Sequence, residues 1–260
     1  MWPFRRKTLL DADAAQWHLD NFAWLARSFP GRARPAGGRP IVPGDGCFVT
    51  DGETGHALAE RLFEQVQRYG GFAGSGIVLV ADDGLPPDGA GPFPIVHGKH
   101  AVGTYSWGGR IGTVADNRPR ISYASKLLAD PQSFIATMAH ELAHHLLRAP
   151  TAEPPPIDED EDEHLTDLAA VYLGFGVFLA NSAFTMRTLP DGWSYSRQGY
   201  LPEQDLVFTT AIHLAVTRSD PAPAKRYLKP HLALMLQTAM DDLKPRSREI
   251  AAMRASDPMA

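Results

Sequence analysis

The sequence predicts an α+β fold, with a small mixed sheet in the first half of the chain and a mostly helical second half. Between residues 76 and 125, short apolar runs alternate with Gly, Pro and Asp-Asn turns, a pattern typical of strands. Beyond residue 130 the strong segments carry apolar residues at helical spacing. An order of helices, then sheet, then helices is that of an α+β protein.

Helices are predicted from this spacing at residues 11–28, 53–69, 131–148, 162–180, 202–218 and 223–243. The third of these has the clearest start, because Asp130 can cap the helix and Pro131 suits its first turn. The first is followed by a Gly/Pro-rich basic segment, residues 30–46, so we expect it to pack as an appendage.

Strands are predicted at residues 76–81, 94–97, 102–107, 111–114 and 120–124. We divide the chain into residues 1–46, which hold the first helix and the linker, and a main domain of residues 47–260. The main domain has a sheet-containing part, 47–148, and a helical part, 149–260. With 260 residues and 44% hydrophobic composition, the chain can bury a substantial core.

Composition excludes several classes of protein. The single Cys47 excludes an internal disulfide framework and a cysteine-based zinc site. A net charge of −5 gives no reason to expect nucleic-acid binding. Asp11 and Asp13 interrupt what would be the apolar part of a secretion signal, and the longest apolar run, residues 168–180, is too short to cross a bilayer. We expect a cytoplasmic protein without an integral membrane segment.

The most informative motif is His140-Glu141-Leu142-Ala143-His144, inside the predicted helix 131–148. The two histidines are one turn apart, so both imidazoles can reach one metal ion, with Glu141 beside the open coordination position. This residue pattern predicts a catalytic metal site. The alternative is a pair of histidines that form ordinary hydrogen bonds within a core helix.

A third ligand has to come from elsewhere, and the next predicted helix offers candidates. The acidic run from Asp158 to Asp162 is typical of a solvated helix N-terminus. Glu163 and Asp167 are one turn apart and share a helix face, so one can bind the metal while the other supports a ligand. From the residues alone, Glu163, Asp167 and His164 all stay open as third ligand.

Together these motifs resemble the gluzincin metallopeptidases, in which His-Glu-x-x-His is followed on a later helix by Glu-x-x-x-Asp. The resemblance covers residues 140–174. It implies one Zn²⁺ per chain held by His140, His144 and Glu163, Glu141 as general base, and Asp167 as the acceptor that orients a ligand histidine. It also implies that an edge strand, 102–107 or 120–124, pairs with an extended peptide.

We therefore expect a zinc-dependent metallopeptidase that hydrolyses peptide bonds in a peptide or protein substrate. A donor to the developing oxyanion is expected from the C-terminal half, where Tyr195, Arg197, Tyr200 and His213 are available; Tyr200 and His213 are preferred. The competing interpretation is a zinc-binding regulatory or interaction protein on a peptidase-like fold, with little hydrolytic activity. An intact Glu141 favours the enzyme, because a structural zinc site has no use for a base.

Overall fold

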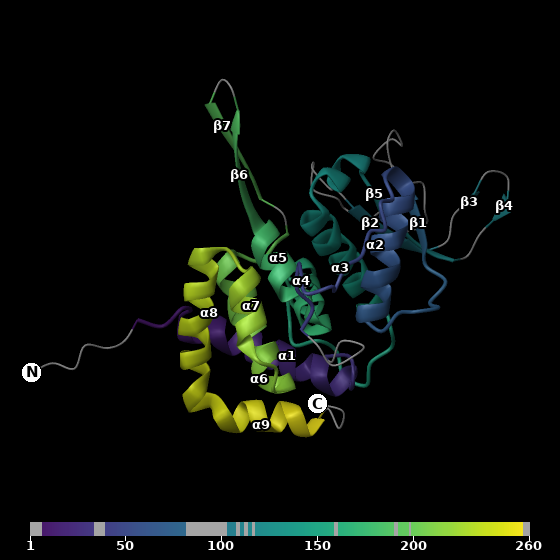
Figure 1. Cartoon of the computed structure of the whole chain (residues 1–260). Coiled ribbons are helices and arrows are strands. Elements are labelled where there is room, and N and C mark those ends of the chain that lie inside the picture. The colour runs from purple at the N-terminus through teal and green to yellow at the C-terminus, as the bar shows by residue number, and fades with distance from the viewer. Residues whose placement is uncertain are drawn as a thin grey trace, which may run out of the picture.

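The computed structural model describes residues 7–33, 40–81, 103–107, 110–111, 114–115, 118–158, 161–189, 192–197 and 199–256. It confirms the α+β class: a three-stranded sheet with α2 and α3 stands beside a larger group of helices (Figure 1). The predicted strand 94–97 and parts of the N-terminal segment, residues 1–6 and 34–39, lie outside the described residues.

The main sheet has the strand order β1-β5-β2 and mixed direction. Strand β5 (Pro119–Tyr123) runs parallel to β1 (Val78–Ala81) and antiparallel to β2 (Gly103–Trp107). The predicted strand 120–124 is therefore central and has no free edge for a peptide. Strand β2 has one neighbour within the described part of the sheet, which leaves 102–107 as the candidate edge.

Short elements surround the sheet. Helix α2 (Gly55–Tyr69) precedes β1, and η1 (Ser125–Ala129), a 3-10 turn, precedes the motif helix. The predicted strand 111–114 is instead a small ladder of β3 (Arg110–Ile111) with β4 (Val114–Ala115).

Helix α3 (Pro131–Leu147) carries the motif and agrees with its predicted bounds within a residue. The Asp130 carboxylate accepts hydrogen bonds from the backbone N–H groups of Gln132 and Ser133, so it caps the helix as predicted. Phe134, Met138 and Leu142 are fully buried. These side chains hold α3 in the core between the sheet and the helical half.

The helical half begins with α4 (Asp162–Ala170), the π-helical turn η2 (Val171–Phe175) and α5 (Gly176–Ala183). Gly174, with φ of 100°, produces the kink between them, a conformation that favours glycine. Further on are α6 (Glu203–Thr217), α7 (Pro221–Tyr227), α8 (Pro230–Leu243), η3 (Lys244–Arg246) and α9 (Ser247–Ser256). The predicted helix 223–243 is therefore two helices, because Pro230 starts a new one.

A hairpin interrupts this helical half, against the prediction. Strand β6 (Phe184–Leu189) pairs antiparallel with β7 (Gly192–Arg197), and the ribbon projects away from the helices in Figure 1. The chain then returns to α6 through residues 199–202. This return segment contributes to the site described below.

Helix α1 (Ala12–Ser28) belongs to the core and is not an appendage. Phe22 and Leu25 are fully buried, and the Phe22 ring packs edge-on against Tyr172 with centroids 5.3 Å apart. The Tyr172 hydroxyl donates to the backbone carbonyl of Phe29 at 2.6 Å. Burial of these aromatic rings explains why the first helix docks although a Gly/Pro-rich segment follows it.

Among the described residues, one continuous helical stretch, Asp162–Ala183, is long and apolar enough to cross a membrane. Its most apolar window is entirely buried inside the fold. That is the position of a core helix, so the stretch does not indicate an integral membrane segment.

Candidate metal centre

Helix α3 presents His140 and His144 on one face. Their rings stand nearly perpendicular, with centroids 4.8 Å apart. The opposite face of α3 is held in the core by buried apolar residues, so the helix cannot rotate to present other side chains at this position. The two imidazoles are therefore fixed as neighbours, as residues one turn apart are expected to be.

Helix α4 brings Glu163 to these imidazoles. Glu163 Oε2 lies 3.2 Å from His140 Nε2 and 3.4 Å from His144 Nε2. This Oε2 atom is buried and forms no hydrogen bond of normal geometry. One donor atom from each residue falls within 4.8 Å of the others, an arrangement that could hold a metal ion.

The distances from Glu163 to the two imidazoles fit a tetrahedral ion. Ligand atoms about 2.0–2.1 Å from zinc, at tetrahedral angles, are about 3.3 Å apart. The two distances to Glu163 Oε2 match that value. Two imidazoles and one carboxylate also form a donor set that zinc accepts, with a fourth position left for water. The residues present therefore fit the metal.

Asp167 does not bond to an Nε2 atom. It bonds instead to the other ring nitrogen of His140. Its Oδ1 accepts a hydrogen bond from His140 Nδ1 at 2.8 Å, and its Oδ2 accepts from the backbone N–H groups of Tyr200 and Leu201 at 2.6 and 2.8 Å. Gly199 makes this approach possible, since its φ is +80° and a Cβ there would lie 3.1 Å from Asp167 Oδ2. Asp167 thus joins α3, α4 and the segment before α6.

Of the three candidates for third ligand, the structure brings Glu163 to the imidazole Nε2 atoms. Both oxygens of Asp167 bond to other groups, and His164 does not belong to the cluster. His145, adjacent to the motif, points elsewhere: its Nδ1 lies 2.9 Å from the Tyr105 hydroxyl.

The ionisable groups of the cluster strongly shift one another's pKa values. Burial lowers the pKa of His140, but its hydrogen bond to Asp167 and the nearby Glu163 outweigh this and raise it to about 10. Burial likewise raises the pKa of Glu163, yet the two histidines outweigh it and hold that pKa well below its usual range. Without metal, His140 is therefore protonated at neutral pH, and metal uptake would release that proton.

Glu141 lies on the side of α3 that faces strand β2. It is only 5% exposed, and burial raises its pKa although both histidines oppose the shift. A Cβ on Gly103 would lie 3.1 Å from Glu141 Oε1 and would overlap Thr137 Cγ2. The start of β2 therefore approaches the carboxylate closely only because residue 103 is glycine.

The two residues preferred as oxyanion donors lie in different places. The Tyr200 ring stacks on His140, with centroids 5.9 Å apart and planes 19° apart, so the structure brings it to the site. His213 is buried in α6 and its Nε2 donates to the carbonyl of Ala33 at 2.7 Å. His213 is thus a core residue, and its assignment to the site is wrong. The side chains of Tyr195 and Arg197 lie outside the described residues.

Thr166 was not predicted. Its Oγ1 lies 3.4 Å from His144 Nδ1 and donates to the carbonyl of Asp162 at 2.8 Å. The signal was present in the sequence, because residues 163, 166 and 167 share one face of a helix.

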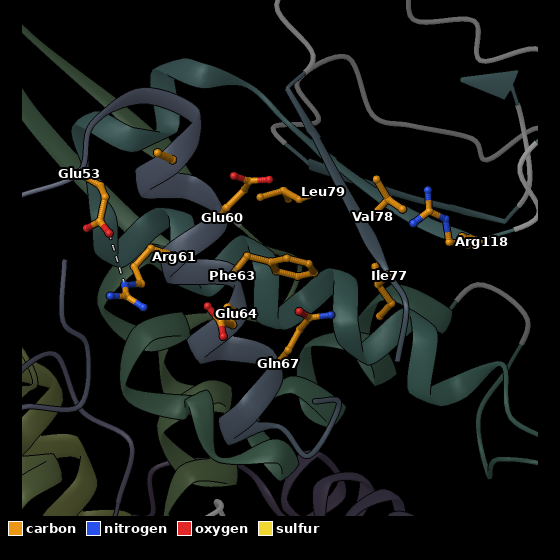
Figure 2. A pocket seen from close by; sticks show the side chains of 11 residues that line it. Glu53, Glu60, Arg61, Phe63, Glu64, Gln67, Ile77, Val78, Leu79 and Arg118 are labelled. Carbon is orange, nitrogen blue, oxygen red and sulfur yellow. Dashed lines mark ion pairs between the residues drawn. The ribbon is translucent and has the colours of Figure 1, made fainter. Parts of the chain in front are cut away.

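A separate hollow lies between α2 and β1 (Figure 2). Its volume is about 540 Å³, and its walls are formed by apolar side chains of both elements together with Glu60, Glu64 and the ion pair of Arg61 with Glu53. None of the predicted site residues lines it. Within the described residues, the cluster that could hold a metal ion is therefore formed by α3 and α4 and is separate from this hollow.

Comparison of the chain with known protein families, curated proteins and solved structures finds no match. The function of the chain is therefore inferred from the geometry of its site.

Proposed function

We propose that the protein is a zinc-dependent metallopeptidase of gluzincin type. The observation that carries the proposal is the position of Glu163 Oε2, which is buried, lies 3.2 and 3.4 Å from two imidazole nitrogens and makes no hydrogen bond of normal geometry to either. Without metal, the charge of this carboxylate is offset by the protonated His140, and a bound cation would replace that proton.

A zinc ion in this position supplies a Lewis acid and lowers the pKa of water to about 7. His140, His144 and Glu163 would hold it. Glu141 would accept a proton from the attacking water and then give it to the leaving amine. Its raised pKa suits this exchange, because a base that must also act as an acid works best near the working pH.

Substrate recognition is assigned to strand β2. Its backbone begins beside Glu141, and within the described sheet its only partner is β5. An extended peptide could pair with the other edge, which would bring its backbone past the carboxylate. Tyr200, stacked on His140, is the candidate donor to the developing oxyanion.

The test compares wild-type protein with Glu141→Gln, measuring bound zinc and cleavage of casein and a peptide library. We expect one zinc per chain in both, and cleavage by wild type at least about 100-fold faster than by the variant. Zinc without cleavage in wild type would favour the regulatory protein instead. Absence of zinc from both would overturn the metal assignment.

A further inference from the structure

We propose that Thr166 positions His144 for metal binding, and that one turn of α4 supplies the third ligand together with the groups that orient both histidines. This inference rests on the metal site of the proposed function but not on hydrolysis. Glu163, Thr166 and Asp167 share one face of α4, directed at α3.

Each histidine of the cluster has a hydrogen-bond acceptor near its Nδ1 atom. A histidine that binds metal through Nε2 carries its proton on Nδ1 and needs an acceptor there. Asp167 Oδ1 is that acceptor for His140 at 2.8 Å. For His144, the atom facing Nδ1 is Thr166 Oγ1 at 3.4 Å.

The direction of the Thr166 hydroxyl proton is set by a hydrogen bond within α4. Thr166 Oγ1 lies 2.8 Å from the carbonyl of Asp162, which can only accept. The hydroxyl proton is therefore directed along the helix, and the oxygen lone pairs are left for His144 Nδ1–H. Thr166 is 1% exposed, so water does not readily replace it as acceptor.

The hydrogen bonds at Nδ1 of the two histidines differ in strength. The partner of His140 is an ionised carboxylate at short distance, and the partner of His144 is a neutral hydroxyl at longer distance. Hydrogen bonds to charged groups are about twice as strong as neutral ones. His144 is thus the less firmly held ligand, and loss of its single neutral acceptor should be measurable as loss of metal affinity.

The experiment measures zinc affinity by competition with a chromophoric chelator for wild type, Thr166→Val and Thr166→Ser. Valine keeps the shape and removes the acceptor, whereas serine keeps the hydroxyl. We expect affinity to fall about 10-fold or more for Thr166→Val and to stay within about 3-fold for Thr166→Ser, in line with the loss of an outer hydrogen bond to a ligand.

A matched control is available at Thr209→Val. Thr209 is fully buried, donates to the carbonyl four residues earlier and faces a histidine Nδ1 at 2.8 Å, but that histidine is His18, which is not in the cluster. This variant should lose stability without losing zinc affinity. In the zinc-loaded protein, NMR should also show faster exchange of the His144 Nδ1 proton in Thr166→Val alone.

The outcomes separate the two proposals. Equal zinc affinity of Thr166→Val and wild type would overturn this inference, whatever the activity. Zinc binding that depends on Thr166, without any cleavage, would support it and end the peptidase proposal. A wild type that binds no zinc would overturn both.

Discussion

Within the described residues the same local arrangement occurs twice, at the junction of α3 with α4 and at the junction of α1 with α6. In each, a threonine hydroxyl donates to the carbonyl four residues earlier and faces Nδ1 of a histidine on another helix. At the second junction the histidine is His18, and its Nε2 lies 2.9 Å from Asp205 Oδ1. Both nitrogens of His18 therefore have protein partners.

The first junction differs at Nε2. His144 Nε2 faces Glu163 Oε2, which also faces His140 and forms no hydrogen bond. A buried histidine with a threonine behind it is thus not a metal site by itself. What distinguishes the first junction is a second imidazole and a carboxylate oxygen that lies close to the Nε2 atoms of both histidines.

The largest expected difference between the two junctions is in metal content. His144→Ala removes one of three donors and should abolish retention of zinc, whereas His18→Ala should leave zinc at the wild-type level. His18→Ala should instead lower the free energy of unfolding by about 2 kcal/mol or more, because Asp205 and Thr209 lose a buried partner. Metal analysis after dialysis and denaturant unfolding check the two outcomes; zinc in His144→Ala would contradict the comparison.

A third buried histidine, His213, extends the comparison to the pH dependence of stability. Burial lowers its pKa to about 4, although its bond to the Ala33 carbonyl opposes the shift. In the unfolded chain its pKa is about 6.5, so between pH 6.5 and 4 the unfolded state binds a proton that the folded state does not. The contribution of neutral His213 to the free energy of unfolding is present above pH 6.5. It is lost as the pH falls toward 4, by about 3 kcal/mol in total.

His213→Gln should remove this dependence, since glutamine keeps an N–H donor and does not titrate. Unfolding free energies measured at pH 7 and pH 4 should differ less in the variant than in wild type by about 3 kcal/mol. Identical pH dependence in the two proteins would mean that His213 is not buried as a neutral ring.

The smallest effect is expected from the carboxylates behind the histidines. Asp167→Asn should weaken zinc affinity about 10- to 100-fold, because it removes the charged acceptor of His140 Nδ1. Asp205→Asn, the counterpart at His18, should not change zinc affinity. Chelator competition on both variants is the measurement, and equal affinities would show that the charge on Asp167 does not matter to the metal.

The sequence predicted the helices that carry the His-His-Glu cluster well because their signals are local. Helix α3 has its cap, its proline and its apolar spacing within one continuous segment, and the histidines follow from helical geometry alone. Glu163 is more distant along the chain, yet the one-turn pairing with Asp167 marked its face.

The errors arose where the outcome depends on distant partners. The hairpin of β6 and β7 was missed because strands are defined by pairing, although Pro190-Asp191-Gly192 is a turn sequence. His213 was misplaced because α6 is buried over most of its surface, so its sequence does not reveal which face meets the site. Thr166 was overlooked because a threonine in a helix usually bonds only to its own backbone.

The three donors come from two helices, so a bound ion would also affect the connection between those helices. Residues 148–161 leave α3 and return to α4, so an ion bound to His144 and Glu163 would close this segment into a loop. The binding free energy of the ion would then oppose local opening of the loop. Chelation should therefore loosen the connection first, and a protease added to the metal-free protein should cut within residues 148–158, which are already mostly exposed, before it attacks the core.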